Sequence, residues 1–405
     1  MSIERLRFTE FNESYEKFVP LSNFIEHISD RNKNNKVNNV LSVSNKMGFI
    51  NQSQQFEDRI VASKNLSNYK IVHKYDFAYN PARINVGSIA RLERFDSGIV
   101  SPMYIVFRTN DKLNSEFLKY FLDTKIFNDQ LTKFLVGSVR QTLDFKSLLK
   151  IKIRNKGHEE QEKIGNFLSL FDRLIEKIET KIGLLKELKK GYLQQIFPAK
   201  GEKVPKIRFT GFNEDWEYIR LNSVLDIKTD FNKNQKYNVN NMFSVSLEYG
   251  ILNQIDHLGR SYAGKDIKRY KITEKYDLIY TKSPLKNAPY GIFKTNFNEV
   301  GLVSPLYAVY KPTTKELSIL FDHYFSTTSL LNNYLRPKVN KGAKNTMNIT
   351  DEVAIKGDIL LPTNIKEQEK IGNFFRNLDL KLEKIVKDLN VIEQLKKGYM
   401  QRLFA

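Results

Sequence analysis

Residues 160–197 read EQEKIGNFLSLFDRLIEKIETKIGLLKELKKGYLQQIF, and residues 367–404 read EQEKIGNFFRNLDLKLEKIVKDLNVIEQLKKGYMQRLF. The two stretches are identical at 19 of 38 positions without a gap. A shorter match precedes each copy, since RFTEFNESYE begins at Arg7 and RFTGFNEDWE begins at Arg208. Self-similarity at a fixed offset is the mark of a repeat architecture. The chain is therefore a tandem duplication of a globular module followed by a helix.

The repeated stretches have helical periodicity. Apolar residues such as Ile164, Phe167 and Phe171 recur every three or four positions, which predicts one apolar stripe along a helix. Each helix could pack on its own module. However, 38 helical residues extend about 57 Å at roughly 1.5 Å per residue, which is longer than a module of this size is wide. We therefore expect the two stripes to pack on each other as an antiparallel coiled coil.

The segments between the helices predict mixed α/β modules, and hence an α+β fold overall. Runs such as VLSVS, DFAYN, MYIVFR, MFSVS, DLIYT and LYAVYK are typical of strands separated by polar turns. Residues 115–135 predict one helix with Ser115 as its cap. Pro198 ends the first long helix and opens a linker. The expected segments are module 1–157, helix 158–197, linker 198–205, module 206–364 and helix 365–405.

The amino-acid composition excludes several classes of protein. The 405 residues include 65 Lys and Arg against 46 Asp and Glu, a net charge of +19, and no cysteine. The lack of cysteine excludes disulfides and thiolate metal sites. With no apparent signal or membrane span, we expect a soluble, cytoplasmic protein. Residues 1–157 and 206–364 carry net charges of +9 and +6, so the modules are expected to bind a polyanion such as DNA.

Catalytic motifs are not recognisable in the sequence. It lacks a phosphate-binding G-x-x-x-x-G-K-[ST] loop, a strand-linked G-x-G-x-x-G and an H-E-x-x-H pair. The two strings at residues 80–83 (NPAR) and 101–104 (SPMY) only partly resemble an amino-methyltransferase tetrad, and we interpret them as turns. We therefore expect no catalytic residues and no metal site.

Basic, amide and aromatic side chains follow several predicted strands. Such groups suit phosphate oxygens and base edges, where Arg pairs with guanine and Asn or Gln with adenine. The candidate DNA-binding residues are Arg59, Lys64, Asn80, Arg83, Arg91, Arg94, Ser138, Arg140 and Gln141 in the first module, and Arg260, Lys265, Lys268, Arg269, Lys282, Lys286, Asn287, Tyr290, Lys344 and Asn345 in the second.

The duplicated EQ-x-x-IG and KKGY motifs, with RFTGFNEDWE at the start of the second module, resemble the specificity (S) subunits of Type I restriction–modification systems. The resemblance spans the chain and implies two target-recognition domains related by a pseudo-twofold axis. Each domain would read half of an asymmetric, bipartite DNA target, and the two repeat helices would hold the domains apart as an antiparallel coiled coil.

The same resemblance implies partners that carry the chemistry. Two methyltransferase (M) subunits would bind S-adenosylmethionine, and two restriction (R) subunits would bind ATP and Mg in the full complex. This chain would then need no cofactor of its own. The resemblance places M-subunit contacts at the starts of the two helices, with the candidates Glu160, Gln161, Ile164, Phe167, Glu367, Gln368, Ile371 and Phe374.

Two other classes remain open from sequence. A coiled-coil DNA-binding regulator or scaffold would bind its site without any methyltransferase partner. A stand-alone DNA-modifying enzyme with a degenerate site would show activity as a purified single chain. The target bases and the gap between half-sites do not follow from the sequence.

Overall fold

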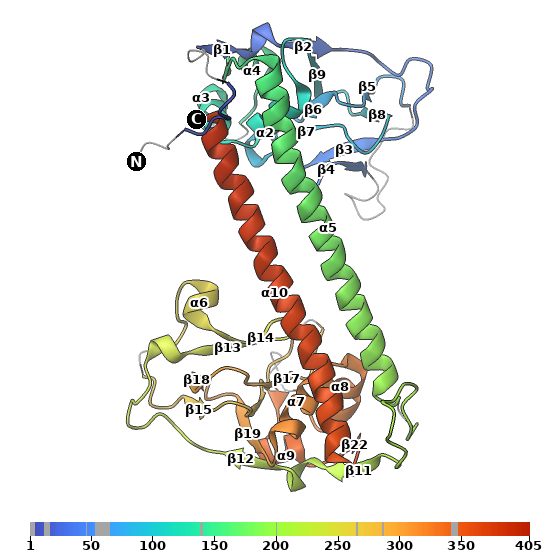
Figure 1. The fold of residues 1–405 in the computed structure, drawn as a ribbon, viewed down its shortest axis with the longest axis vertical. Helices are drawn as coiled ribbons and strands as arrows, with labels where there is room; N and C mark the ends of the chain where they lie inside the picture. The colour runs from blue at the N-terminus through green and yellow to red at the C-terminus, as the bar shows by residue number, and fades with distance from the viewer. Residues whose placement is uncertain are drawn as a thin grey trace. The chain divides into compact units, whose positions relative to one another are not determined.

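The computed structural model describes residues 5–11, 17–45, 47–52, 65–137, 141–199, 201–264, 266–285, 287–341 and 347–405. The chain forms two compact units. Unit 1 comprises residues 1–179 with 387–405, and unit 2 comprises residues 180–386. Each unit combines one mixed module with a part of both long helices, α5 and α10 (Figure 1). The segments expected from the sequence, in contrast, keep each long helix separate from the modules.

Unit 1 is built on a four-stranded antiparallel sheet of order β2-β9-β6-β7. Three strand pairs, β1–β10, β3–β4 and β5–β8, lie outside this sheet. The elements are β1 Phe18–Pro20, β2 Ile25–Ile28, β3 Leu41–Ser44, β4 Gly48–Asn51, β5 Lys70–His73, β6 Phe77–Tyr79, β7 Ile89–Arg91, β8 Ser97–Val100, β9 Ile105–Thr109, α2 Ser115–Leu122, α3 Lys125–Phe134, α4 Phe145–Leu148 and β10 Lys152–Arg154, with short 3-10 turns at Leu21–Asn23 and Ile84–Val86.

Unit 2 repeats this design with a sheet of order β12-β19-β16-β17 and equivalent pairs β11–β22, β13–β14 and β15–β18. The structure also describes the short helix α6 and the two-residue strands β20 and β21 in this unit. The elements are β11 Glu217–Arg220, β12 Leu225–Lys228, β13 Phe243–Ser246, β14 Gly250–Asn253, α6 Gln254–Leu258, β15 Lys271–Thr273, β16 Leu278–Tyr280, β17 Phe293–Thr295, β18 Gly301–Val303, β19 Ala308–Pro312, α7 Lys315–Tyr324, α8 Thr328–Leu335, β20 Asn340–Lys341, β21 Met347–Asn348, α9 Asp351–Ile355 and β22 Asp358–Leu361, with 3-10 turns at Leu221–Ser223 and Val239–Asn241.

The central strands of both sheets are buried on both faces. Phe77 and Tyr79 of β6 are fully buried, and the Phe77 ring stacks on Phe107 of β9 at 5.1 Å between centroids. Leu278 and Tyr280 of β16 are buried in the same way. Continuous apolar runs of this kind are typical of strands covered on both sides. The predicted strands and the mixed α+β character are thereby confirmed.

The prediction of one continuous helix over residues 115–135 is wrong. The structure has two helices, α2 and α3, because Thr124 begins a new one: its Oγ1 accepts a hydrogen bond from the Phe127 backbone N–H at 3.1 Å. The cap of α2 is Asn114 rather than Ser115, since the Asn114 Oδ1 accepts from the Glu116 N–H at 2.9 Å. The Thr124 hydroxyl, by capping the turn that follows, therefore breaks an otherwise periodic run.

The two repeat segments form long helices, α5 at His158–Ile196 and α10 at Ile365–Phe404. In unit 1, Ile164 and Leu168 of α5 and Leu403 and Phe404 of α10 belong to the same hydrophobic core as α2. In unit 2, the end of α5 and the start of α10 likewise enter one core with α7 and α8. Among the helices that the structure describes, none has the length and apolar character needed to cross a membrane.

Candidate nucleic-acid interface and partner-binding helices

The EQ motif at the start of α5 anchors that helix to its own module. The buried Glu160 carboxylate accepts hydrogen bonds from Arg7 at 3.1 and 2.7 Å and from the Lys156 Nζ at 2.7 Å. Burial by itself would raise the pKa of Glu160. The hydrogen bonds from Arg7 and Lys156 have the larger combined effect, so the pKa of Glu160 lies below its ordinary value. The Gln161 amide donates to the backbone carbonyls of Lys156 and Lys112 at 2.7 and 3.2 Å.

The same anchor recurs at the start of α10. Glu367 is fully buried and accepts from the Arg208 Nε and Nη2 at 2.7 and 2.8 Å, while the Trp216 Nε1 donates to it at 3.4 Å. The Gln368 amide donates to the Pro362 carbonyl at 2.7 Å. Each EQ motif thus joins a helix start to the RF segment that opens its module. The sequence signal for this pairing is that both the RF segment and the EQ motif recur in each half of the chain, although they are 153 residues apart in one half and 159 in the other.

The predicted M-subunit contacts lie mostly inside the chain. Most of their side chains are buried inside the single chain, because they hold the helix starts to the modules; these are Glu160, Gln161, Ile164, Glu367, Gln368 and Ile371. Phe167 and Phe374 are only partly buried, but they too pack within the chain, against Tyr399 and Tyr192 respectively. Exposed residues on the same helical turns remain available to a partner; they are Glu159, Glu162, Lys163, Asn166, Lys366, Glu369, Lys370 and Asn373.

Within each unit, α5 and α10 also contact each other through an ion pair. In unit 1, Asp172 of α5 contacts Lys396 of α10 and accepts from the Tyr120 hydroxyl of α2 at 2.6 Å. Aromatic contacts from Tyr399 to Phe167 and Phe171 lie beside it. Burial raises the pKa of Asp172, but the bonds from Lys396 and Tyr120 outweigh it, so its pKa lies below the ordinary value.

Unit 2 has the equivalent ion pair between Lys189 of α5 and Asp379 of α10. His323 of α7 occupies the place that Tyr120 has in unit 1, with its Nδ1 3.7 Å from the Asp379 carboxylate. This imidazole is fully buried, and neither of its nitrogens has a hydrogen-bond partner. Burial lowers the pKa of His323 to about 3, so the side chain is neutral at pH 7.

A cluster of possible metal ligands lies at the same place. Among the described residues, Asp322, His323 and Asp379 bring one ligand atom each within 4.8 Å of one another. However, Lys189 contacts Asp379, and the Lys294 Nζ lies 3.7 Å from the Asp322 carboxylate. These ammonium groups offset the carboxylate charges, which disfavours a further cation. We therefore assign no metal to this cluster.

We expect the stability of unit 2 to fall as the pH drops from about 6.5 to 5. The unfolded His323 takes up a proton near its ordinary pKa of 6.5, whereas the folded imidazole, facing Asp322, Asp379, Lys189 and Lys294, does not. Since the unfolded state binds more protons in this range, the free energy of unfolding decreases by up to about 1.4 kcal/mol per pH unit.

Urea unfolding followed by the fluorescence of Trp216, the single tryptophan, measures this dependence in unit 2. His323→Tyr, which introduces the residue found at Tyr120 of unit 1, should make the free energy of unfolding of unit 2 less dependent on pH. His158→Gln changes an exposed histidine at the start of α5 and should leave this dependence intact. An unchanged slope in His323→Tyr would contradict the assignment.

The predicted DNA-binding residues divide into three groups. Exposed side chains are Asn287, Arg83, Arg94, Gln141, Arg260, Lys268 and Arg269, with Asn80 and Tyr290 half-buried. Residues Arg59, Lys64, Ser138, Arg140, Lys265, Lys286, Lys344 and Asn345 lie outside the described residues. Arg91 and Lys282 form ion pairs within the chain.

Arg91 makes internal contacts in the chain. Its guanidinium is buried and donates to the Ser115 Oγ at 2.9 Å and to the Glu93 carboxylate at 2.9 Å, and it also contacts Glu116. In unit 2, the half-buried Lys282 contacts the Asp351 carboxylate. The chain sequence does not distinguish such internal pairs from exposed cations, because the acidic partners are distant in sequence or on another element.

The exposed candidates of unit 1 do not form one cluster. Asn80 and Arg83 follow β6, and the Leu143 N–H donates to the Pro81 carbonyl at 3.2 Å, which brings the segment containing Gln141 beside them. Arg94 follows β7, which runs antiparallel to β6. It therefore lies at the opposite end of the sheet from Asn80 and Arg83.

In unit 2 the basic candidates come closer together. Lys268 and Arg269 directly precede β15, where the Lys271 Nζ lies 2.9 Å from Asp351. Because Lys282 contacts the same carboxylate, the segments before β15 and after β16 meet at Asp351. Arg260 lies earlier in the loop, with its guanidinium 4.7 Å from the Tyr262 ring. Lys271 stands in the basic stretch 265–271 but is not among the sequence candidates, and Asp351 is 80 residues away in sequence, so the sequence gives no sign that the two side chains pair.

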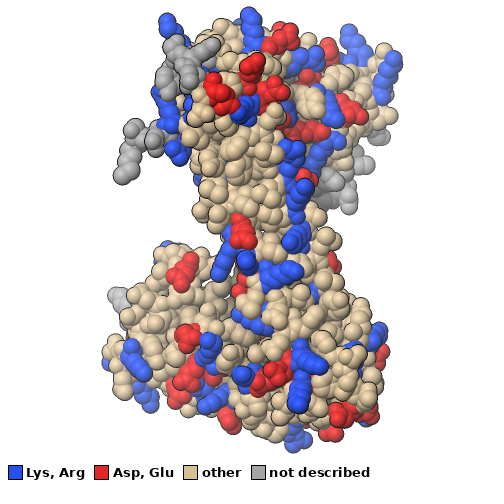
Figure 2. Space-filling view, in the orientation of Figure 1, with Lys and Arg blue, Asp and Glu red and all other residues tan. Residues whose placement is uncertain are grey.

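Figure 2 shows acidic and basic side chains interspersed over unit 2 on the face in view. Over unit 2, the basic side chains in this view are therefore not gathered into one patch. An interface for DNA requires several cations near one another. Which candidate residues lie close together therefore says more about a DNA-binding surface than the net charge of the chain does.

Comparison with known proteins places these features in a family context. The protein is 31% identical over 136 residues to the Type I restriction enzyme MjaVIII specificity subunit of Methanocaldococcus jannaschii, covering 33% of this chain and 32% of the relative. The MjaIX specificity subunit of the same organism is 31% identical over 140 residues, covering 31% of each chain. The matched part thus spans about a third of these relatives' length. No protein-family model matches the chain.

The fold has a solved counterpart. A Type I restriction–modification S subunit from M. genitalium superposes with a TM-score of 0.60 and covers 98% of both chains at 12% identity. At that identity the likeness shows the fold. Together with the curated relatives, it confirms the resemblance to specificity subunits that the duplicated motifs indicate.

Proposed function

We propose that this protein is the DNA-specificity subunit of a cytoplasmic Type I restriction–modification complex. The observation that carries the proposal is similarity to named specificity subunits in sequence, joined to a whole-chain likeness to an S subunit in fold. The +19 charge, most of it in the two modules, supports a polyanionic ligand. The chain itself is non-catalytic in this proposal, and it selects the DNA on which its partners act.

Each module reads one half of a bipartite target in this proposal. Arg83 and Gln141 in unit 1, and Lys268 and Arg269 in unit 2, carry the side-chain types that pair with guanine or adenine edges or with phosphates. Because the loops of the two modules differ in sequence, the half-sites should differ too. The resulting target is asymmetric.

The helices α5 and α10 form an antiparallel coiled coil in this proposal, with the modules related by a pseudo-twofold axis. Two sets of equivalent contacts support it. Arg7–Glu160 corresponds to Arg208–Glu367. Asp172–Lys396 corresponds to Lys189–Asp379 with the two helices exchanged. A twofold-related pair of readers suits duplex DNA, which has a twofold axis of its own.

Two M subunits dock on the exposed turns at the helix starts, and two R subunits join them in the full complex. In this proposal S-adenosylmethionine is bound by M, and ATP and Mg by R, so this chain supplies recognition and assembly alone.

The proposal is tested by co-expressing the chain with its methyltransferase subunit and mapping methylated bases in genomic DNA. An asymmetric sequence of two half-sites separated by a fixed gap is the expected result. A coiled-coil regulator or scaffold would bind its site tightly but leave the DNA unmethylated. A stand-alone enzyme would modify DNA without partners. We expect the purified chain alone to show no methyltransferase, nuclease or ATPase activity.

Replacing Arg260 and Arg269 with Ala is expected to weaken recognition of one half-site only. A side chain that pairs with a base contributes on the order of 1 to 3 kcal/mol of discrimination, whereas a phosphate contact mainly changes the salt dependence. Binding to DNA in which each half-site is mutated in turn measures the effect. Arg83→Ala is the matched change in unit 1 and should affect the other half-site. Equal losses at both half-sites for one variant would argue against two independent readers.

A further inference from the structure

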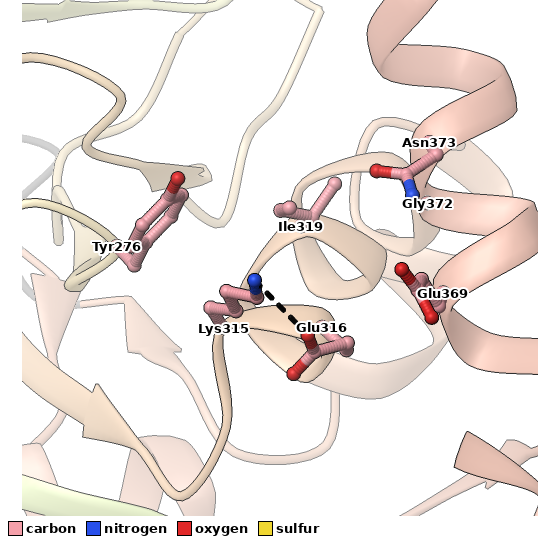
Figure 3. A pocket seen from close by; sticks show the side chains of 7 residues that line it. All are labelled: Tyr276, Lys315, Glu316, Ile319, Glu369, Gly372 and Asn373. Atoms are coloured by element: carbon pink, nitrogen blue, oxygen red, sulfur yellow. Dashed lines mark ion pairs between the residues drawn. The ribbon is translucent and has the colours of Figure 1, made fainter. Parts of the chain in front are cut away.

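Unit 2 contains a pocket of about 140 Å³ between α7, α10 and the turn that precedes β16. Figure 3 shows that Tyr276 comes from the turn, Lys315, Glu316 and Ile319 from α7, and Glu369 and Asn373 from α10. A buried cavity of similar size, about 150 Å³, holds a benzene ring in another protein. The pocket can therefore hold a planar group of that size or smaller.

The equivalent place in unit 1 is filled by an arginine of the chain itself. The Arg91 guanidinium lies 5.2 Å from the centre of the Tyr75 ring and contacts Glu116. Tyr75 corresponds to Tyr276, and both have left-handed backbones, with φ of 73° and 69°. Such a conformation is uncommon for a bulky residue. Its recurrence shows that both modules hold this ring in the same way.

The pocket of unit 2 arises from two substitutions between the modules. The Tyr75 N–H donates to the Leu92 carbonyl and the Tyr276 N–H to the Asn296 carbonyl, so Thr295 takes the place of Arg91. The helix glycines Gly165 and Gly372 adjoin Glu116 and Ile319 respectively, so Ile319 takes the place of Glu116. Unit 2 thus has shorter, uncharged side chains where unit 1 has Arg91 and Glu116. The tyrosine ring remains without the guanidinium that covers it in unit 1.

The lining of the pocket favours a cation. Glu369 is exposed and, among the described residues, has no hydrogen bond or ion pair. Glu316 lies 3.7 Å from the ammonium of Lys315, which also lines the pocket, so two carboxylates face one ammonium and the lining keeps one excess negative charge. Carboxylates repel DNA phosphates but attract a guanidinium, which also stacks on aromatic rings. A protein side chain therefore fits this pocket better than DNA does.

We propose that the pocket beside Tyr276 receives an arginine side chain of the methyltransferase subunit that docks on α10. The inference rests on the proposed function, because it names a contact within that assembly. The guanidinium stacks on Tyr276 and pairs with Glu369, as Arg91 stacks on Tyr75 and pairs with Glu116. Unit 1 supplies this arginine internally, so the two units present different surfaces to equivalent partners.

The chain alone provides the first test. In the full-length chain with labelled isoleucine methyl groups, N-acetyl-L-arginine amide should shift the Ile319 resonance, and the neutral citrulline analogue should not. Glu369→Gln should weaken the arginine effect at least threefold. The matched unit 1 variant, Glu162→Gln, should not change it. Equal shifts by both probes, no shift by arginine, or no effect of Glu369→Gln would overturn the proposal.

The assembly provides the second test. Thr295→Arg with Ile319→Glu copies unit 1 and fills the pocket, and Glu369→Lys reverses its charge at an exposed position that should not affect folding. Both should lower the affinity for the methyltransferase subunit at unit 2 at least tenfold, with Trp216 fluorescence reporting the fold. Unchanged affinity in Glu369→Lys would overturn the proposal while leaving the proposed function intact. If the unmodified chain binds no methyltransferase subunit, both are overturned.

Discussion

Inserting four residues after Gly183 and four after Glu383 is expected to lengthen the gap between half-sites by about one to two base pairs. The contacts Lys189–Asp379 and Tyr192–Phe374 place Gly183 opposite this part of α10. Four helical residues add about 6 Å and slightly more than one turn, so the apolar stripe is nearly preserved. One base pair of DNA extends about 3.4 Å. Mapping methylated sites measures the gap, and both half-sites should remain unchanged.

A two-residue insertion at the same positions is the control. It rotates the rest of each helix by about 200°, which turns the apolar stripe away from its partner. Complex assembly and methylation should be lost. If the four-residue variant still methylates DNA with the original gap, α5 and α10 do not set the spacing.

Replacing Glu367 with Ala is expected to destabilise unit 2 by about 3–5 kcal/mol. The change leaves the largely buried Arg208 guanidinium without its carboxylate, and removing one partner of a buried pair has a cost of this size. The Trp216 indole loses the same acceptor, so its fluorescence in urea unfolding reports the loss directly. Glu160→Ala should destabilise unit 1 comparably, since Glu160 pairs with Arg7 and Lys156.

The neighbouring Glu369 gives a matched control. It lies two residues along α10 and is exposed, so Glu369→Ala should change the free energy of unfolding by less than about 0.5 kcal/mol. A comparably small effect of Glu367→Ala would show that the anchor does not hold the helix start to its module.

Much of the fold follows from periodicity in the sequence. The duplicated helices and the central strands, such as β6 and β16, could be predicted because their apolar patterns are long or continuous. The break at Thr124 could not, because a capping hydroxyl competes with helix propensity only when the turn it caps is packed.

The candidate sites were harder to predict for a related reason. Glu160 and Arg91 belong to residue types that usually lie on the surface. In the structure both are buried, Glu160 against Arg7, 153 residues away, and Arg91 against Glu116, 25 residues away. A single sequence shows which residues are charged, but it does not show which of them form ion pairs in the folded chain. The pocket beside Tyr276 depends on the loss of such a pair, so it emerges only when the two modules are compared in structure.

The last turn of α10 has a consequence for the order of folding during synthesis. Leu403 and Phe404 belong to the core of unit 1, where the Phe404 ring stacks on Phe117 at 4.6 Å, and the Leu6 N–H donates to the Arg402 carbonyl. Unit 2 is continuous in sequence, whereas unit 1 needs residues from both ends of the chain. As the nascent chain leaves the ribosome, the module made second can therefore complete its core first. The module made first keeps Phe117 uncovered until translation reaches Phe404, which makes it the part of the newborn chain most in need of protection from aggregation.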